Sequence, residues 1–115
     1  MREVFIYLRD ERKRPVVTLC LIKTDSGEIA RGMAVCSPKD MPSKTVGRMH
    51  ALCRAEEALY CKEVIPIVEK NPIKVVFNAL CASRQTKRFL PFMSVAYWSV
   101  YAPVLSGFEA KVLGL

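Results

Sequence analysis

The stretch CSPKDMPSKTVGR, residues 36–48, joins a predicted strand to a predicted helix, and the rest of the chain is organised around it. Two prolines turn the chain after Cys36. Ser43 is a favourable helix N-cap, because its hydroxyl can accept a hydrogen bond from a backbone amide one turn later. We therefore expect a long helix that starts after Ser43 and ends at about Lys62.

Two cations stand at the start of this predicted helix. Lys44 and Arg48 are one helical turn apart, so both lie near the free backbone amides and the positive end of the helix dipole. This arrangement is typical of a phosphate or carboxylate site. The stretch is neither a Walker loop nor a dinucleotide-binding fingerprint. In the alternative interpretation, the two cations are solvated, Arg48 extends past the helix end into water, and Ser43 only caps the helix.

The predicted helix is apolar on two sides. The first side carries, in order, Arg48, Leu52, Ala55 and Leu59. Small residues flank this side and predict the close approach of a sheet or a second helix: Gly47, Ala51 and Ala58. The second side carries Val46, Met49, Cys53 and Tyr60. A helix with two apolar sides is usually covered on both, so we expect another subunit or the C-terminal segment to cover the second side.

The chain before this stretch has the pattern of three strands. Val4–Leu8, Val16–Lys23 and Glu28–Cys36 are short apolar runs rich in residues that favour strands. Thr24–Gly27 has the composition of a turn, which favours an antiparallel hairpin. We expect a three-stranded meander, with the charged segment Arg9–Pro15 as a solvated connection.

After the helix, Pro66 prevents its continuation and Glu69–Pro72 is expected to turn. Ile73–Leu80 is a predicted fourth strand, and Ser83–Arg88 is a basic connection. Phe89–Leu105 is apolar and aromatic, but it is interrupted by prolines and is shorter than the about 20 residues of a membrane span. Ser106–Glu109 forms a capping box that starts a short helix.

The fold class predicted from these elements is α+β. An antiparallel sheet, made of the N-terminal meander and at least one later strand, packs on one long central helix, and a short helix follows at the C-terminus. The 115 residues form one domain with one core, and the composition, 51% apolar and 25% charged, is globular. The net charge of +7 suggests an anionic partner.

The five cysteines are an odd number, and no secretion signal is evident before the first strand. These features predict free thiols in a reducing cytoplasm, packed mostly as small apolar groups. The lone histidine, His50, has Cys53 and Cys61 beyond it, which is too loose a set for a zinc site. Cys53 has apolar surroundings that favour an inert thiol. We therefore expect a binding protein that is not an enzyme and uses no metal or cofactor.

Part of the chain resembles a known family of small phage-encoded proteins. The first matching residues are Gly32, Ala34, the run Cys36–Asp40, Ser43, Lys44, Gly47, Arg48, Ala51, Arg54 and Ala55. The tail, with Pro103, Leu105, Phe108, Glu109 and Leu113, is similar to the C-terminal ends of those proteins. The family is the phage anti-Thoeris sponge proteins, which sequester the cyclic ADP-ribose isomer made by a bacterial TIR-domain defence enzyme. Residues 63–101 lie outside the resemblance.

The resemblance implies a non-enzymatic cage for a small, doubly phosphorylated cyclic nucleotide, with an extension to cyclic oligonucleotide signals. It also implies a homo-oligomer, based on dimers and reaching a hexamer, in the cytoplasm of the infected bacterium. The resemblance supports only the location of the site. The residues predicted to bind the ligand are Lys39, Ser43, Lys44, Arg48, Arg84, Lys87, Arg88 and Tyr101. Tyr101 represents the aromatic rings that can stack on a base.

Two other functions stay open on the sequence. The first is a basic phage protein that binds nucleic acid or inhibits a host defence complex, and its binding to a polyanion would weaken steeply with salt. The second is an interaction module whose apolar C-terminal surface docks on a host protein. We expect the aromatic residues of Phe89–Leu105 to pack in the core or in a subunit contact, and the alternative is that one or two of the rings stack on a nucleobase.

Overall fold

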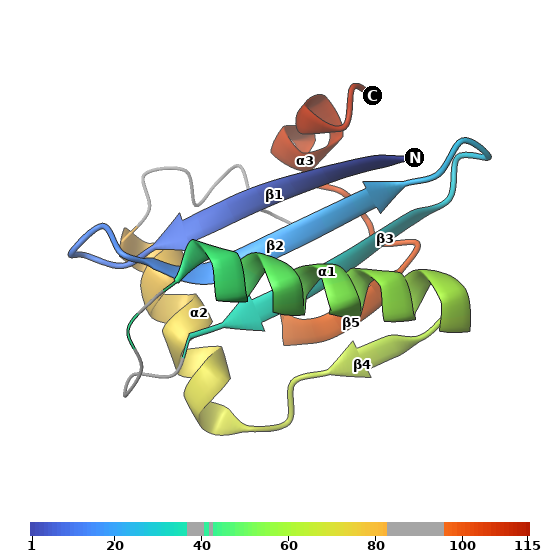
Figure 1. Cartoon of the computed structure of the whole chain (residues 1–115). Helices are drawn as coiled ribbons and strands as arrows, with labels where there is room; N and C mark the ends of the chain where they lie inside the picture. The colour runs from blue at the N-terminus through green and yellow to red at the C-terminus, as the bar shows by residue number, and fades with distance from the viewer. Residues whose placement is uncertain (37–40, 42, 83–95) are drawn as a thin grey trace.

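The computed structural model describes residues 1–36, 41, 43–82 and 96–115. The elements are β1 (Arg2–Arg9), β2 (Pro15–Lys23), β3 (Ile29–Val35), α1 (Lys44–Cys61), β4 (Val64–Pro66), α2 (Lys70–Ala82), β5 (Tyr97–Tyr101) and α3 (Gly107–Val112). The strands form one sheet in the order β1-β2-β3-β5-β4, and all neighbours are antiparallel. The predicted α+β class, the N-terminal meander, the long helix and the short C-terminal helix are confirmed (Figure 1).

The meander has the predicted connections. Arg2 pairs with Lys23 across β1 and β2, and Lys23 pairs with Ile29 across β2 and β3. Gly27 takes a positive φ of 92° in the second turn. In the first turn the Asp10 carboxylate accepts hydrogen bonds from the backbone amides of Arg12 and Arg14, both at 2.9 Å. The charged segment is therefore a turn that Asp10 holds together.

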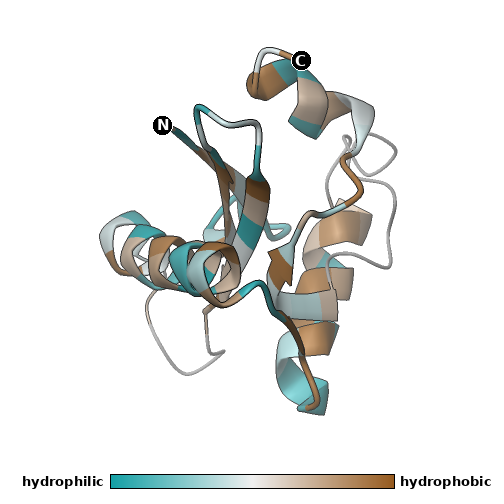
Figure 2. Cartoon of the chain, turned by 90° about the vertical axis from the view of Figure 1, so that its right-hand side faces the viewer, coloured by the Kyte–Doolittle hydropathy of each residue, from teal (hydrophilic) through white to brown (hydrophobic). Residues whose placement is uncertain are grey.

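The sheet buries both faces, because alternate residues of each strand point to opposite sides. One face packs on α1, and its buried members are Cys20, Ile22, Ala30 and Ala34. The other face packs on α2 and α3, and its buried strand members are Ile6, Leu8, Val17, Leu19, Leu21 and Met33. Figure 2 shows α1 on one side of the sheet and α2 and α3 on the other. The protein is therefore a three-layer structure with the sheet in the middle.

Small residues set the contact between α1 and the sheet. The buried residues of α1 are Ala51, Ala55, Ala58 and Leu59. A Cβ atom on Gly32 of β3 would lie 2.1 Å from the carbonyl oxygen of Ala51 and 2.3 Å from the amide nitrogen of Ala55. The helix backbone therefore rests directly on a glycine of the sheet. This confirms the close approach predicted from the small residues. The buried side of α1 is centred on its alanines and does not include Arg48, which is exposed.

The prediction of a strand at Ile73–Leu80 is wrong, because these residues lie in α2. The β-branched residues of this segment favour a strand locally, but the burial has the period of a helix. Val76, Ala79 and Leu80 are buried against the sheet. Pro72 does not oppose the helix, because it lies in the first turn, where a backbone amide has no intrahelical partner. The turn expected at Glu69–Pro72 likewise gives way to the start of α2 at Lys70.

A buried ion pair attaches α3 to the sheet. Arg31 of β3 donates from Nε to Oε2 of Glu109 at 2.8 Å and from Nη2 to Oε1 at 2.6 Å, and both side chains are almost fully buried. Glu109 also completes the predicted capping box, since its Oε1 accepts from the Ser106 amide at 3.0 Å. One carboxylate thus serves both as a helix cap and as the partner of a buried guanidinium.

Ala102 follows β5 in the left-handed conformation, with φ at 51°. The left-handed conformation destabilises the folded state by about 1–2 kcal/mol for an alanine, because its Cβ crowds the backbone. A glycine avoids this crowding, but the greater entropy of its unfolded chain lowers the free energy of unfolding by about 0.4–1 kcal/mol. We expect Ala102→Gly to stabilise the fold by about 0.5 kcal/mol in urea unfolding. In the control, Ala110→Gly inside α3, the fold should lose about 1 kcal/mol. A destabilised Ala102→Gly protein would contradict this account of the turn.

Candidate functional site

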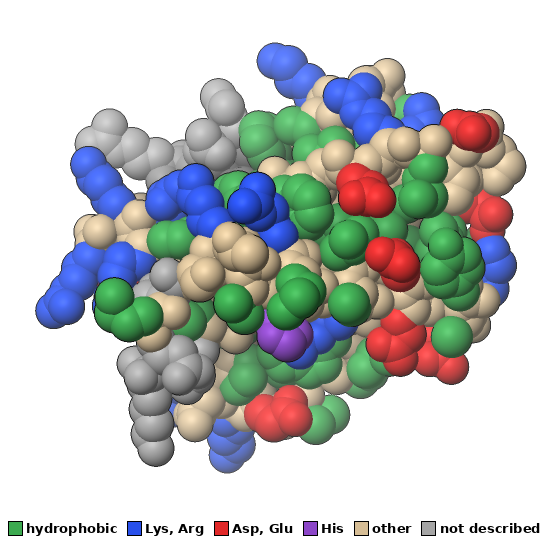
Figure 3. Space-filling model, in the orientation of Figure 1, with side chains coloured by type: hydrophobic (Ala, Val, Ile, Leu, Met, Phe, Trp, Pro, Cys, Tyr) green, Lys and Arg blue, Asp and Glu red, His purple; other side chains and the backbone are tan. Residues whose placement is uncertain are grey.

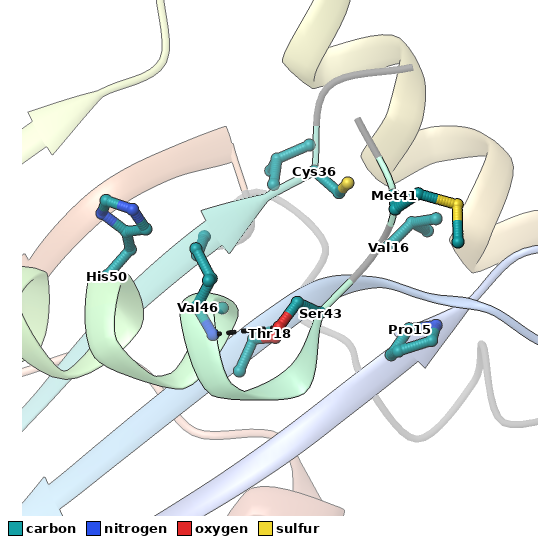
Figure 4. Close-up of a pocket in the computed structure, with 11 residues that line it drawn as sticks. Pro15, Val16, Thr18, Cys36, Met41, Ser43, Val46 and His50 are labelled. Atoms are coloured by element: carbon teal, nitrogen blue, oxygen red, sulfur yellow. Dashed lines mark hydrogen bonds between the residues drawn. The ribbon is translucent and has the colours of Figure 1, made fainter. Parts of the chain in front are cut away.

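A pocket of about 430 Å³ lies where α1 begins. Its lining comes from three elements and the segment between them: Thr18 of β2, Cys36 after β3, and Ser43, Gly47 and His50 at the start of α1. Pro15, Val16 and Met41 add an apolar part (Figure 4). The volume is within the range of small-molecule sites, which is about 300–1,000 Å³. Polar groups and an apolar wall therefore meet at the position where the sequence predicts an anion site.

The start of α1 has the predicted cap. Ser43 is extended, with φ at −131°, and its Oγ accepts a hydrogen bond from the Val46 amide at 3.4 Å. The Gly47 amide donates to the Ser43 carbonyl oxygen at 2.9 Å. A Cβ on Gly47 would lie 2.5 Å from Oγ1 of Thr18, so this glycine lets the first turn of α1 approach β2. The pocket floor is built by this close approach.

The two cations of the predicted site lie outside the pocket lining. Nζ of Lys44 is 4.9 Å from the centroid of the Tyr7 ring, a cation–π contact on β1. Arg48 is exposed, as the alternative interpretation expected. Both belong to a basic end of the molecule, where exposed cations of the β1–β2 turn also gather: Arg12, Lys13 and Arg14. Figure 3 shows Lys and Arg side chains concentrated at this end.

Another predicted residue, Tyr101, is not at this pocket. Tyr101 lies in β5 near the other end of α1, where its hydroxyl donates to Oε2 of Glu28 at 2.7 Å and its ring lies 4.6 Å from Nζ of Lys62. Tyr101 and Ser43 therefore do not share a site. The other predicted ligands lie outside the described residues: Lys39, Arg84, Lys87 and Arg88.

Glu28, Lys62 and Tyr101 form a polar cluster at the C-terminal end of α1. Lys62, the left-handed C-cap of α1, bonds to the Glu28 carboxylate. Hydrogen bonds from Lys62 and Tyr101 lower the pKa of Glu28, and the bond to Glu28 raises the pKa of Lys62. The cluster connects the helix end to β3 and β5, so its role is structural.

This cluster gives a prediction about pH. Because the pKa of Glu28 is lowered on folding, its contribution to stability is present above the ordinary carboxyl pKa of about 4.3 and is lost as the pH falls through the folded value. The raised pKa of Lys62 makes its contribution complete below about 10.4 and lost at higher pH. We expect Glu28→Gln to be less stable than wild type at pH 7, with the difference shrinking toward pH 3 in urea unfolding. A constant difference would show that the carboxylate charge has no part in the cluster.

Arg54 has a structural role that the sequence did not reveal. The β3–β5 ladder stops at Gly32, and Nη1 of Arg54 donates to the next carbonyl oxygen, that of Met33, at 2.7 Å. The guanidinium also lies 4.3 Å from the centroid of the Trp98 ring, and burial lowers the pKa of Arg54. No signal in the sequence near Arg54 indicates a contact with residue 98.

The cysteines differ from the prediction. None of the five forms a disulfide, but only Cys20 is buried, where burial raises its pKa to about 12. The expectation that most of them pack as apolar groups is wrong, because three are exposed: Cys53, Cys61 and Cys81. The described part of the chain contains no group of three or more His, Cys, Asp or Glu residues that could hold a metal ion.

Among the helices that the structure describes, none combines the length and the apolar character needed to cross a membrane. Comparison with known proteins does not add to this description of the site. The chain matches no family model, no curated protein and no solved structure at a significant level.

Proposed function

We propose that this protein binds and sequesters a small phosphorylated cyclic nucleotide of the cyclic ADP-ribose type, without cleaving it. The proposal rests mainly on the pocket at the start of α1, which combines the N-terminal end of a long helix, the Ser43 cap and a volume of about 430 Å³. The resemblance to anti-Thoeris sponge proteins names the ligand class. The proposed setting is the cytoplasm of an infected bacterium, and the proposed assembly is a homo-oligomer.

The electrostatic surroundings of the pocket favour an anion. Lys44 and Arg48 lie on the first turns of α1, outside the pocket lining. Exposed cations of the β1–β2 turn lie at the same end of the molecule, where Figure 3 shows Lys and Arg side chains. The first turn of α1 carries no acidic residue. Charges outside a pocket raise the local concentration of an anionic ligand and its association rate, even without direct contact. The two cations thus supply long-range attraction, together with the positive end of the α1 dipole.

Ultrafiltration tests this proposal. The purified protein is mixed with the cyclic ADP-ribose isomer produced by a TIR-domain enzyme, and the filtrate is assayed for free ligand. We expect the ligand to stay with the protein and to be recovered intact after denaturation. Free ligand in the filtrate would contradict binding, and recovery of a cleaved product would contradict sequestration and point to Cys36 and His50, which share the pocket.

The nucleic-acid hypothesis is the second candidate, and the basic end of the molecule is the observation that favours it. The two functions differ in their response to salt. Binding to a long polyanion loses about 10³–10⁵ in affinity between 50 and 200 mM salt when six to ten phosphates are contacted. Capture of one small nucleotide should change far less over this range.

A further inference from the structure

The ring of Tyr7 lies beside the start of α1. Tyr7 pairs with Thr18 across β1 and β2, so the two side chains share one face of the sheet, with Cβ atoms about 4.5–5.5 Å apart. Thr18 lines the pocket, and Ser43 lines it from the start of α1. The next residue, Lys44, places its Nζ 4.9 Å from the centroid of the Tyr7 ring. The ring is therefore one strand away from a pocket residue and in contact with the first residue of the helix.

The face of the Tyr7 ring is covered by a side chain that is easily moved. Tyr7 is half-buried in the sheet, and the group over its ring is the ammonium of Lys44. Lys44 is exposed, and its charge lies at the end of a long, flexible chain. This ammonium can leave the ring without any change in the core.

Two interactions compete for this face of the ring. A cation–π contact at an exposed site is favourable by a factor of about 2–5. Stacking of a nucleobase on an aromatic side chain strengthens binding by a factor of about 5–140. A lysine that leaves the ring also becomes available to a phosphate group. A nucleotide at the start of α1 therefore gains more from the exposed ring than the contact with Lys44 loses.

The other described rings that have a cation over them are less suited to this role. Trp98 and Tyr101 both lie on β5, which is separated from β2 by β3. Trp98 packs against the hydrophobic core, and the hydroxyl of Tyr101 is bonded to Glu28. Tyr7 is on the strand next to Thr18, so it alone of these three rings adjoins the pocket.

We propose that the nucleobase of the ligand stacks on the ring of Tyr7, and that Lys44 moves from this ring to a phosphate group when the ligand binds. The inference rests on the proposed function and gives Tyr7 the stacking role that the sequence predicted for Tyr101. The phosphates then lie at the start of α1, where the positive end of the helix dipole favours negative charge. The base lies over β1.

Three variants separate stacking from other effects. Tyr7→Phe keeps an aromatic ring, Tyr7→Leu keeps only an apolar side chain, and the control Tyr60→Leu removes a tyrosine that is 71% exposed near the other end of α1. Calorimetry with the cyclic ADP-ribose isomer measures the affinity, and circular dichroism checks the fold. We expect Tyr7→Phe and Tyr60→Leu to bind like wild type, and Tyr7→Leu to bind about 5- to 140-fold more weakly.

Fluorescence gives a direct readout of the stacking. Tyr7→Trp places an indole where the base is proposed to stack, and a stacked base should quench its emission. The wild type has Trp98 as its single tryptophan, so the same titration of the wild type gives the background. We expect the ligand to quench the emission of Tyr7→Trp well beyond this background.

The outcomes distinguish this inference from the proposed function. If the wild type binds the isomer and folded Tyr7→Leu binds it equally well, the proposed function stands and the stacking role of Tyr7 is wrong. Equal losses in Tyr7→Phe and Tyr7→Leu, or no quenching of Tyr7→Trp beyond background, would also overturn the stacking role. The fluorescence result decides the question if Tyr7→Leu does not fold. A wild type that does not bind the isomer would refute the proposed function and this inference together.

Discussion

Gly32→Ala is expected to destabilise the protein by about 3 kcal/mol, the upper end of the usual cost of overpacking. The added methyl group would lie 2.1 Å from the Ala51 carbonyl oxygen and 2.3 Å from the Ala55 amide nitrogen. Both atoms belong to the backbone of α1, so no side-chain rotation relieves the contact. The helix must move away from β3, which opens the cluster around Ala51, Ala55 and Ala58.

Urea unfolding measures this effect, and Gly107→Ala is the matched control. A Cβ on Gly107 meets no atom within 4 Å, and the position is the first of α3. This variant should be as stable as wild type or gain up to about 1 kcal/mol from helix propensity. Wild-type stability in Gly32→Ala would contradict the packing of α1 directly on the sheet.

Glu109→Ala is expected to cost about 3–5 kcal/mol, because it leaves a buried guanidinium without its carboxylate. Arg31 is 2% exposed, and after the substitution it keeps the hydrogen bond from Nη2 to the Val104 carbonyl oxygen, at 3.4 Å. Its Nη1 already has no hydrogen-bond partner. The substitution also removes the carboxylate that caps the amide of Ser106.

Two further variants separate charge from packing in this pair. Replacing both partners, with Arg31→Met and Glu109→Leu, should recover most of the lost stability, because no unpaired charge then remains buried. Asp25→Asn removes the partner of the N-terminal amine in an exposed ion pair, and it should change stability by less than about 0.5 kcal/mol. If Glu109→Ala costs as little as Asp25→Asn in urea unfolding, the pair does not hold α3 on the sheet.

Local sequence signals were sufficient to predict several helix starts and turns. The cap at Ser43, the turn at Gly27 and the capping box at Ser106 each depend on side chains within a few residues of the backbone groups they serve. Small residues on one side of α1 likewise predicted its close contact with the sheet. These features follow from the sequence because both partners of each interaction are visible in one short segment.

Other features depend on residues that are far apart in the chain. Arg31 and Glu109 are separated by 78 positions, and nothing near either residue indicates the pair. The contact of Arg54 with Trp98 is of the same kind. The strand predicted at Ile73–Leu80 failed because contact with the sheet outweighed the local preference of its β-branched residues.

The predicted site residues and the residues that line the pocket overlap only in part. Ser43 lies in the pocket as expected, whereas Lys44 contacts Tyr7 and Tyr101 belongs to a cluster at the other end of α1. Thr18 and His50 were not among the predicted ligands, and both line the pocket. Their participation depends on how closely the first turn of α1 approaches β2, which a residue pattern does not give.

Charge reversal at the start of α1 tests the central claim, that this end of the helix attracts and holds an anionic nucleotide. The variant is Lys44→Glu with Arg48→Glu, and the control is Lys23→Glu with Lys111→Glu, which changes the net charge equally at the end of the sheet near the termini. Calorimetry with the cyclic ADP-ribose isomer measures the affinity, and circular dichroism checks the fold. We predict a loss of about 100-fold in the first variant, or about 1.4 kcal/mol for each cation, and a far smaller loss in the control. Equal affinity of the folded Lys44→Glu/Arg48→Glu variant and the wild type would contradict the claim.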